Sequence, residues 1–374
     1  MILCSDPRAQ YLAHKADIDA AVARVLASNS YVLGAEVAAF EREFGTYLGG
    51  ASVVGVGSCT DALTLALRAL DVGAGEVVTT ALSATATLAA IVAAGAAPVV
   101  ADISDDTLNL SPAAVERALT PATRAIIAVH LHGCPAEMDA LAAIARKRGL
   151  ALIEDCAQAS GARYRDRPVG TLGDIGCFSF YPTKNLGAVG DGGAVATTQP
   201  ALAERIRGLR QYGWDAGRKT REPGVNSRLD EIQAAILRVK LPYLDSDNAR
   251  RRAIAARYDR GLAGAGLRLP SPPPHVSAVF HQYVVRTRSR SALMARLEAS
   301  GIRAGIHYAV PLHREPGYKS HLRAPASLPL SEHAADSVVS LPMYPELTDK
   351  QVDAVIASAN DVLVAAHVTE AIHV

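Results

Sequence analysis

Between residues 50 and 200, short apolar runs alternate with longer segments in which apolar residues recur every three or four positions. The runs predict seven strands, at 52–56, 76–80, 98–103, 124–130, 151–154, 176–180 and 193–197. The periodic segments predict helices at 60–70, 86–94, 111–119 and 138–148. Strands that alternate with helices over short connections form a mostly parallel sheet, and nearly continuous apolar strands are buried on both faces. We therefore expect an α/β fold whose central sheet is covered by helices.

The second half of the chain shows a different pattern of predicted helices and strands. Helices are expected at 201–211, at 229–239, with Pro242 marking the end, and at 248–262. A stiff, proline-rich connection follows at 269–274, and strands at 282–287 and 305–308 then flank a helix at 291–300. This pattern predicts an N-terminal segment and large domain over 1–245 and a smaller C-terminal α/β domain over 246–374.

Composition narrows the classes of function. The 374 residues include 38 Lys and Arg against 37 Asp and Glu, so the chain has no basic surplus for a nucleic-acid backbone. Apolar residues make up 49% of the chain, which is ample for a large core and excludes general disorder. The most apolar stretch, 88–100, is interrupted by Gly95 and Pro98. It is shorter than the about 20 residues that a membrane span needs, so we expect neither a nucleic-acid partner nor a membrane.

The cysteines and the N-terminus point to a compartment. The chain has five cysteines, an odd number, and no CxxC motif. Its first residues lack the apolar core of a signal peptide. A reduced, cytoplasmic protein is the simplest interpretation. The closest group of metal-ligating types, at 130–134, lies at a strand end, where alternate side chains usually face one way without binding metal. No metal is expected.

Ligands of open α/β sheets bind outside the carboxyl ends of the strands, so the segments that follow each strand deserve inspection. The first strand leads into a small-residue turn and a helix start. There, the hydroxyl groups of Ser58 and Thr60 and the nearby backbone N–H groups could hold one phosphate. A dinucleotide fingerprint would need a glycine where Thr60 stands. An ordinary N-cap at Ser58 or Thr60 is the alternative interpretation.

Two further strand ends carry charged groups. Asp155 follows the strand at 151–154, and Lys184 lies in the loop between the last two strands. Alone, Asp155 could be an N-cap and Lys184 a solvated loop residue. Together with the phosphate-binding turn, they match what pyridoxal phosphate requires. This cofactor takes an amine for a Schiff base, a carboxylate for its ring nitrogen and donors for its phosphate.

Several ordered motifs then make the chain recognisable. They are YVLG at 31–34, GSCTDAL at 57–63, EDCAQ at 154–158, FSFYPTKNLG at 178–187, GDGGA at 190–194, NSRLD at 226–230, IHY at 306–308 and LPMYP at 341–345. In these segments, which span nearly the whole length, the chain resembles the DegT/DnrJ/StrS family of sugar aminotransferases. These are pyridoxal-phosphate enzymes of fold type I. The resemblance implies that fold, that cofactor and an active homodimer with shared active sites.

The resemblance also implies roles for individual residues. Lys184 would hold the cofactor and shuttle the proton, Asp155 would pair with the ring nitrogen, and Gln158 would contact the phenolic oxygen of the ring. The phosphate would be held by three residues of the turn that leads into the first predicted helix of the sheet, and by a serine at the end of a strand. An asparagine would reach the phosphate of the neighbouring subunit's cofactor. These are Ser58, Cys59, Thr60, Ser179 and Asn226.

Four more residues resemble substrate-side positions of the family: Tyr31, Arg228, His307 and Tyr308. Two structural alternatives stay open for them. Tyr308 could belong to the core, and Arg228 could pair with Asp230 or Glu231.

The chain departs from the family pattern at two positions. Cys59 stands where the turn usually has glycine, and Ala84 stands where an aromatic side chain usually stacks on the cofactor ring. What covers the ring in this chain is left open by the sequence. The departures bear on cofactor affinity and substrate choice more than on the class of reaction.

The resemblance implies an aminotransferase that converts a nucleotide-linked keto-sugar to an amino sugar, with L-glutamate or L-glutamine as the amino donor. A keto-cyclitol aminotransferase of antibiotic assembly, of the scyllo-inosose type, shares the same motifs. Three other classes are weighed against it. A dehydratase of the same fold has histidine in place of the lysine, and a nicotinamide oxidoreductase explains neither Lys184 nor the missing glycine. A catalytically silent regulatory relative is supported by Ala84, but the intact set of Asp155, Gln158, Ser179 and Lys184 weighs against it.

Overall fold

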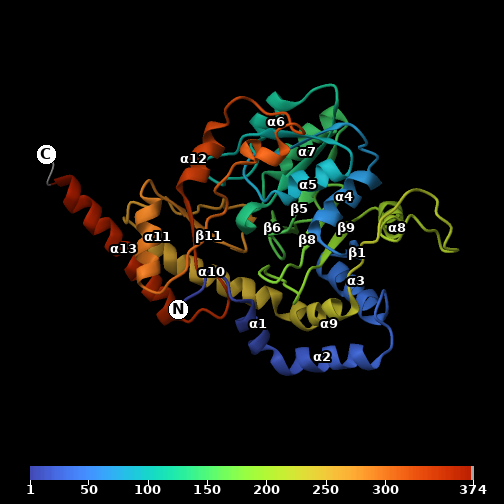
Figure 1. Ribbon diagram of the computed structural model, residues 1–374, viewed down its shortest axis with the longest axis horizontal. Helices are drawn as coiled ribbons and strands as arrows, with labels where there is room; N and C mark the ends of the chain where they lie inside the picture. Colours follow the sequence, from blue (N-terminus) through green and yellow to red (C-terminus); the bar gives the residue numbers. More distant parts are fainter. Residues whose placement is uncertain (372–374) are drawn as a thin grey trace.

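The computed structural model describes residues 1–371 and centres on a seven-stranded sheet (Figure 1). In spatial order its strands are β1 (Ser52–Val56), β9 (Gly193–Thr197), β8 (Ile175–Ser179), β5 (Ala151–Asp155), β4 (Thr123–Val129), β2 (Glu76–Thr80) and β3 (Ala97–Ala101). Only β9 runs antiparallel to its neighbours. Each of the seven predicted strands is present, with bounds within two residues of those expected. The predicted α/β fold with a mostly parallel sheet is confirmed.

Helices cover both faces of this sheet. On one face pack α4 (Cys59–Ala69), α5 (Ala86–Ala93) and α8 (Pro200–Leu209). The other face is covered by α3 (Ala35–Tyr47), α6 (Pro112–Ala118), α7 (Met138–Arg148) and α9 (Glu231–Lys240). Successive strand residues serve opposite faces: Ile126 packs toward α6 and α7, whereas Ile127 packs toward α4. Two-sided burial explains why the strands read as apolar runs.

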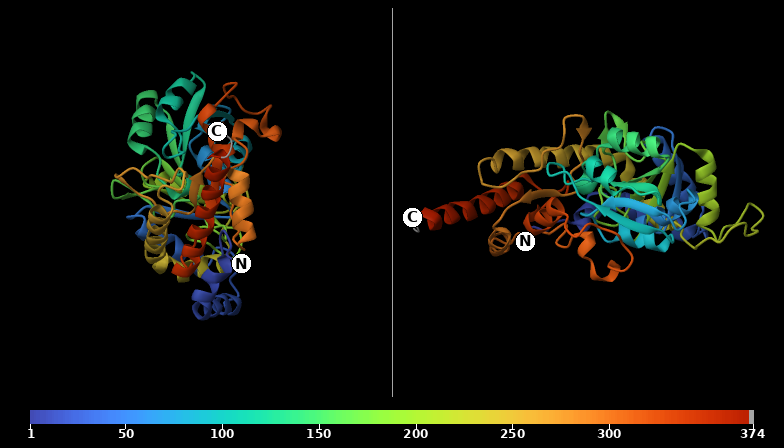
Figure 2. Two further views of the ribbon diagram at one scale, coloured as in Figure 1. Left: turned by 90° about the vertical axis from the view of Figure 1, so that its left-hand side faces the viewer. Right: turned by 90° about the horizontal axis from the view of Figure 1, so that it is seen from above.

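Two N-terminal helices and several short elements lie around the large sheet and its covering helices (Figures 1 and 2). The N-terminal helices α1 (Pro7–Ala13) and α2 (Lys15–Ala27) lie beside α9, and α2 packs on it. The short strands β6 (Arg163–Tyr164), β7 (Arg167–Pro168) and β10 (Val276–Ser277) form a small sheet. Short 3₁₀ turns lie at Leu131–Gly133, Leu241–Tyr243, Leu312–Arg314 and Pro316–Tyr318. No helix within residues 1–371 is long and apolar enough to cross a membrane.

A separate apolar core occupies the C-terminal part. The antiparallel strands β11 (Tyr283–Arg286) and β12 (Val338–Leu341) pack against α10 (Leu244–Gly261), α11 (Arg290–Ala299) and α13 (Asp349–Ala371). In contrast, α12 (Pro329–Ser337) contributes Ala334 and Ala335 to the core on the α4 face of the large sheet. The helix α10 begins in one core, at Leu244, and reaches the other at Ile254. The division into two domains at residue 245 stays a prediction.

One prediction for this part was wrong. The segment 305–308 is not a strand: only Gly305 forms a bridge, with Ser340, and β12 is the strand that pairs with β11. The segment is irregular because His307 and Tyr308 turn toward the large sheet, as described below. By contrast, Pro242 marks the end of the helix as predicted, since α9 ends at Lys240. It lies in a short 3₁₀ turn from which α10 starts at Leu244, since proline is tolerated where its missing N–H would have no helical partner.

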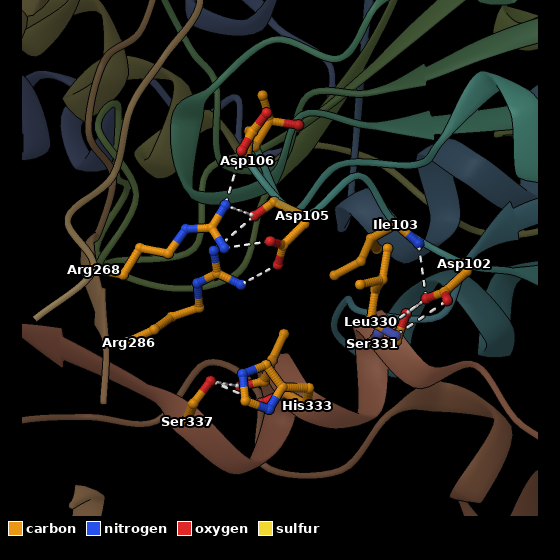
Figure 3. A network of polar contacts seen from close by, with 12 residues as sticks. Asp102, Ile103, Asp105, Asp106, Arg268, Arg286, Leu330, Ser331, His333 and Ser337 are labelled. Atoms are coloured by element: carbon orange, nitrogen blue, oxygen red, sulfur yellow. Dashed lines mark hydrogen bonds and ion pairs between the residues drawn. The ribbon is translucent and has the colours of Figure 1, made fainter. Parts of the chain in front are cut away.

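Charged side chains fasten the C-terminal part to the loop after β3 (Figure 3). Arg286 Nη1 donates to Asp105 Oδ1 over 2.5 Å, and Arg268 forms a second ion pair with the same carboxylate. Asp102 accepts from the backbone N–H of Ser331, over 2.9 Å, and from its hydroxyl group. These contacts hold β11 and the first turn of α12 against the large sheet. These contacts therefore restrict the position of the segment that connects β11 with α12.

Candidate active site

The predicted site residues of the large sheet gather at one edge. Asp155 is the last residue of β5 and Ser179 the last of β8, so both side chains lie at carboxyl ends of parallel strands. The turn before α4 reaches the same edge, because it crosses Gly193, the cross-strand partner of Ser179. A Cβ atom on Gly193 would lie 2.5 Å from the carbonyl carbon of Ser58 and 2.7 Å from the nitrogen of Cys59. Only glycine permits this approach.

The Asp155 carboxylate is buried and bound by neutral donors. Oδ1 accepts from the Ala157 N–H over 3.1 Å and from the Cys59 thiol over 3.9 Å, and Oδ2 accepts from the Thr87 hydroxyl over 3.2 Å. Burial raises the pKa of Asp155, while the Ala157 and Thr87 hydrogen bonds and the charge of Lys184 oppose the rise. A buried carboxylate of this kind gains from a cationic ligand, such as a protonated ring nitrogen.

The Lys184 ammonium lies near this carboxylate. Burial lowers the pKa of Lys184, and the nearby Cys59 and Asp155 oppose the decrease. Within residues 1–371, no hydrogen bond or ion pair involves this ammonium group. The loop around it is fixed, since the next side chain, Asn185, donates to Asn248 over 2.7 Å and to the Val279 carbonyl over 3.0 Å. A lysine with a lowered pKa and no partner is available to bind a carbonyl carbon.

The start of α4 supplies donors for an anion. Ser58 is its N-cap, and its hydroxyl accepts from the Asp61 N–H over 3.1 Å. The N–H groups of Cys59 and Thr60 lie in the first turn, where a helix offers no acceptor of its own and the helix dipole favours negative charge. The N-cap and phosphate-binding interpretations of this turn are therefore compatible. Ser179, whose hydroxyl accepts from the Tyr181 N–H over 3.3 Å, is buried at the same edge.

Gln158 connects this edge with the C-terminal part of the chain. Its Oε1 accepts from the His132 N–H over 2.5 Å, and its Nε2 donates to the Tyr308 hydroxyl over 3.0 Å. His132 Nε2 in turn lies 3.0 Å from the His307 carbonyl, and His307 Nδ1 lies 2.8 Å from the Ser340 hydroxyl. The predicted substrate-side pair, His307 and Tyr308, thus meets the predicted cofactor residues.

Burial and the charged centre shift the pKa of both residues of this pair. Burial raises the pKa of Tyr308 to about 12, and the charge of Asp155 adds to the rise. Burial lowers the pKa of His307 to about 4, and the charge of Lys184 adds to the decrease. Both side chains are therefore uncharged at neutral pH. Tyr308 also packs against the core, so both interpretations of its sequence position hold.

Arg228 is free to bind a ligand. The sequence left open an ion pair with Asp230 or Glu231, but the Glu231 carboxylate accepts from the N–H groups at the start of α3, those of Gly34, Glu36 and Val37, over 2.7–2.9 Å. Within the described part of the chain the Arg228 guanidinium has no ion pair or hydrogen bond. A half-buried, unpaired guanidinium near a site is suited to phosphate or carboxylate.

Tyr31 and Asn226 are exposed, and Asn226 lies two residues before Arg228 in the chain. Val32 forms a bridge with Asp230, which brings the Tyr31 segment next to Arg228. The residue after Asn226, Ser227, accepts from the Gly57 N–H over 2.9 Å, so this segment touches the turn before α4. Whether Asn226 serves the neighbouring subunit's cofactor stays a prediction.

One group of metal-ligating types lies beneath the site: His130, Glu154 and Cys156, all buried. Its ligand atoms already have partners. His130 contacts Glu154 over 3.0 Å and accepts from the Ala136 N–H, and Glu154 also accepts from three backbone N–H groups at 170–173. The cluster therefore fixes the loop between β7 and β8 and offers a metal no free donor set.

Thr87 and His132 were missed as site residues in the sequence. Thr87 lies three residues after Ala84 and was assigned no role, and His132 was considered only within the group of metal-ligating types at 130–134. No local sequence pattern marks either residue, because each contacts partners that are distant in the chain. Thr87 contacts Asp155, and His132 contacts Gln158 and His307.

Comparisons with known proteins identify the family. The model of the DegT/DnrJ/EryC1/StrS aminotransferase family matches residues 13–360. The chain belongs to this family. A dTDP-3-amino-3,4,6-trideoxy-alpha-D-glucose transaminase from Streptomyces venezuelae is 48% identical over 348 residues, which cover 92% of each chain. The chain is thus an aminotransferase, and members of the family depend on pyridoxal phosphate.

Solved relatives share the fold throughout. The crystal structure of S. venezuelae DesV in complex with a ketimine intermediate matches with a TM-score of 0.94 and 46% identity, covering 97% of this chain and 98% of that one. A Bacillus subtilis protein, NtdA, with bound cofactor PMP, matches with a TM-score of 0.87 and 30% identity, over 94% and 82% of the two chains. These matches confirm fold type I.

Proposed function

We propose that this aminotransferase binds pyridoxal phosphate and transfers an amino group from L-glutamate or L-glutamine to a nucleotide-linked keto-sugar. One observation carries the proposal: the unpartnered Lys184 ammonium lies beside a buried carboxylate, Asp155, at the edge where α4 begins. The amine, the carboxylate and the first-turn N–H groups are the three contacts that this cofactor needs.

The chain's own residues have distinct tasks in this reaction. When bound, pyridoxal phosphate supplies the carbonyl that takes up the amino group and the ring that delocalises the electrons of the reacting carbon. Asp155 holds the ring nitrogen in its protonated form, Gln158 orients the ring, and Ser58, Thr60 and Ser179 hold the phosphate. Lys184 moves the proton, because its amine is largely desolvated and has no competing partner.

The substrate side supports a nucleotide-linked sugar. The free Arg228 guanidinium matches the charge of a diphosphate, and the exposed Tyr31 ring lies on the neighbouring segment. The transaminase relative described above acts, by its name, on a dTDP-linked sugar. His307 and Tyr308, uncharged at neutral pH, face the reacting end of the sugar.

A spectroscopic experiment tests the cofactor, and a substrate panel tests the reaction. Purified protein with pyridoxal phosphate should show a band above roughly 400 nm, as expected for a protonated Schiff base, that L-glutamate or L-glutamine removes. Borohydride added before any amino donor should attach the cofactor mass to the peptide that contains Lys184. Product masses from a panel of keto-sugar nucleotides and keto-cyclitols identify the acceptor. Turnover of cyclitols alone would favour the keto-cyclitol alternative. No band before a donor is added, or a band that neither donor removes, would contradict the proposal.

We further propose a cytoplasmic homodimer with shared active sites. The exposure of Asn226 and Tyr31 in one chain, next to Arg228, is consistent with a partner that completes the site. All five cysteines are free, which fits a reducing compartment. Sedimentation gives the oligomeric state, and Asn226→Ala should weaken cofactor binding by about 1–3 kcal/mol, the value of a charge-assisted hydrogen bond. An active monomer, or unchanged affinity in the variant, would contradict shared sites.

A further inference from the structure

The Asp155 carboxylate has a side-chain donor on each oxygen. The Thr87 hydroxyl donates to Oδ2 over 3.2 Å, and the Cys59 thiol donates to Oδ1 over 3.9 Å. Thr87 comes from the first turns of α5 and Cys59 is the first residue of α4, so the two donors reach the carboxylate from different helices. Apart from the Ala157 N–H, they are the only hydrogen-bond donors to this carboxylate within residues 1–371.

Cys59 is well suited to act as a donor and poorly suited to act as a nucleophile. The residue is buried, and burial together with the charge of Asp155 raises the pKa of its thiol well above the ordinary value. The thiol therefore keeps its proton at neutral pH and presents it to Asp155 Oδ1. Lys184, whose charge opposes this rise, is close enough to be affected by the same pair.

We propose that Cys59 is a positioning residue of the aminotransferase reaction. By donating to Oδ1, its thiol keeps the buried Asp155 carboxylate ionised and oriented for the ring nitrogen of the cofactor. Thr87 does the same on Oδ2. This inference rests on the proposed function, since it concerns the carboxylate assigned to the ring nitrogen.

The proposal has a pH-dependent consequence. Burial already raises the pKa of Asp155, and the Ala157 and Thr87 hydrogen bonds and the charges of Lys184 and His130 oppose the rise. A thiol that donates to Oδ1 favours the charged form in the same way. Loss of the thiol should therefore raise the pKa of Asp155 further. Cofactor binding weakens as the pH falls and Asp155 takes up a proton, because a neutral carboxyl group no longer attracts the ring cation. Without the thiol, this weakening should begin at a higher pH.

The test compares the dissociation constant of pyridoxal phosphate as a function of pH in five proteins. In Cys59→Ala, we expect the acid limb to move up by about 0.5–1 pH unit, the scale of one modest hydrogen bond to a charged group. Thr87→Val should move it in the same direction. Cys59→Ser, which keeps an O–H donor, should follow the natural protein. Cys156→Ala is the matched control, because this neighbouring buried thiol donates to the Glu154 carbonyl and not to Asp155.

The outcomes separate the two proposals. If the natural protein binds no pyridoxal phosphate at any pH, the proposed function fails. If the natural protein binds pyridoxal phosphate and Cys59→Ala loses affinity for it at the same pH as the natural protein, the proposed role of Cys59 is wrong. An equal shift in Cys156→Ala would also overturn it, since the cause would then be core packing. If Cys59→Ala does not fold, the nearly isosteric Cys59→Val takes its place: an acid limb displaced to higher pH than that of Cys59→Ser supports the proposal, and acid limbs that coincide contradict it.

Discussion

The two walls of the candidate site are built in different ways. On one wall, Asp155 and Ser179 each end a parallel strand, so the backbone of the sheet places them directly. On the other, His307 and Tyr308 lie in an irregular segment held by distant partners. His132, which contacts the His307 carbonyl, is 175 residues away in the chain, and Leu312 donates to the Ala81 carbonyl.

This difference separates two kinds of task. In the proposed function, the sheet wall carries the groups that take part in bond making, where a fixed geometry is needed. The other wall, proposed to face the substrate, depends on side-chain contacts that a single substitution can remove. Substitutions on the sheet wall should therefore abolish turnover in a folded protein. Substitutions on the other wall should change substrate binding and pH dependence.

The largest effect is expected from Lys184→Ala. The variant removes the amine that binds the cofactor and moves the proton, so transamination should be undetectable. The protein should still fold, because the Lys184 ammonium makes no hydrogen bond or ion pair within residues 1–371. Turnover assays together with thermal unfolding check both statements. Full activity in the variant, or borohydride labelling of another lysine, would show that Lys184 does not hold the cofactor.

Asp155→Asn should come next. Asparagine keeps the shape but not the charge that holds a proton on the ring nitrogen, so the rate constant should fall by about 10³-fold or more, exceeding any loss in cofactor affinity. Steady-state kinetics at saturating cofactor separate the two effects. Near-natural turnover would show that the electron sink does not depend on this carboxylate.

Tyr308→Phe tests the second wall. The change removes the hydroxyl that accepts from Gln158 Nε2 over 3.0 Å. Because this contact positions substrate-side groups, KM for the keto-sugar should rise by about 3–10-fold with a smaller change in kcat. Tyr243→Phe, at an exposed position, is the control. A large loss of kcat with unchanged KM would place Tyr308 among the groups of the sheet wall.

The same wall should make the protein sensitive to acid. The pKa of His307 is lowered to about 4 in the folded protein, so between about pH 6.5 and 4 the unfolded chain binds the additional proton. His307 therefore costs stability as the pH falls through this window, and His307→Gln should flatten the decline in Tm. The exposed His321→Gln should not change it. Parallel curves for His307→Gln and the natural protein, measured from pH 7 to 4, would contradict this.

The smallest effect is expected from Ala84→Phe. An added ring beside the cofactor should tighten its binding by about 0.5–1.5 kcal/mol, the value of a stacked aromatic pair. If the natural sugar needs the space above the ring, its KM should rise at the same time. Cofactor titration and steady-state kinetics measure the two effects. Unchanged cofactor affinity would show that position 84 does not border the ring in this chain.

The sheet wall was predictable from the sequence because its geometry is local. A strand of period two ends at a defined residue, and parallel strands end at the same edge, so Asp155, Ser179 and the turn at Ser58 could be grouped without a structure. The lysine loop followed from its place between two predicted strands. The family resemblance then added the roles.

Contacts between distant segments were decided only by the tertiary structure. The sequence predicted a strand at 305–308, but the pairing with β11 went to β12, and His307 turned toward His132. Likewise, Thr87 and Cys59 meet at Asp155 only because two helices start at the same sheet edge. Periodicity shows which residues are buried, but not which of two apolar segments pairs with a strand or which donors meet a buried carboxylate. Those choices depend on how the whole chain packs.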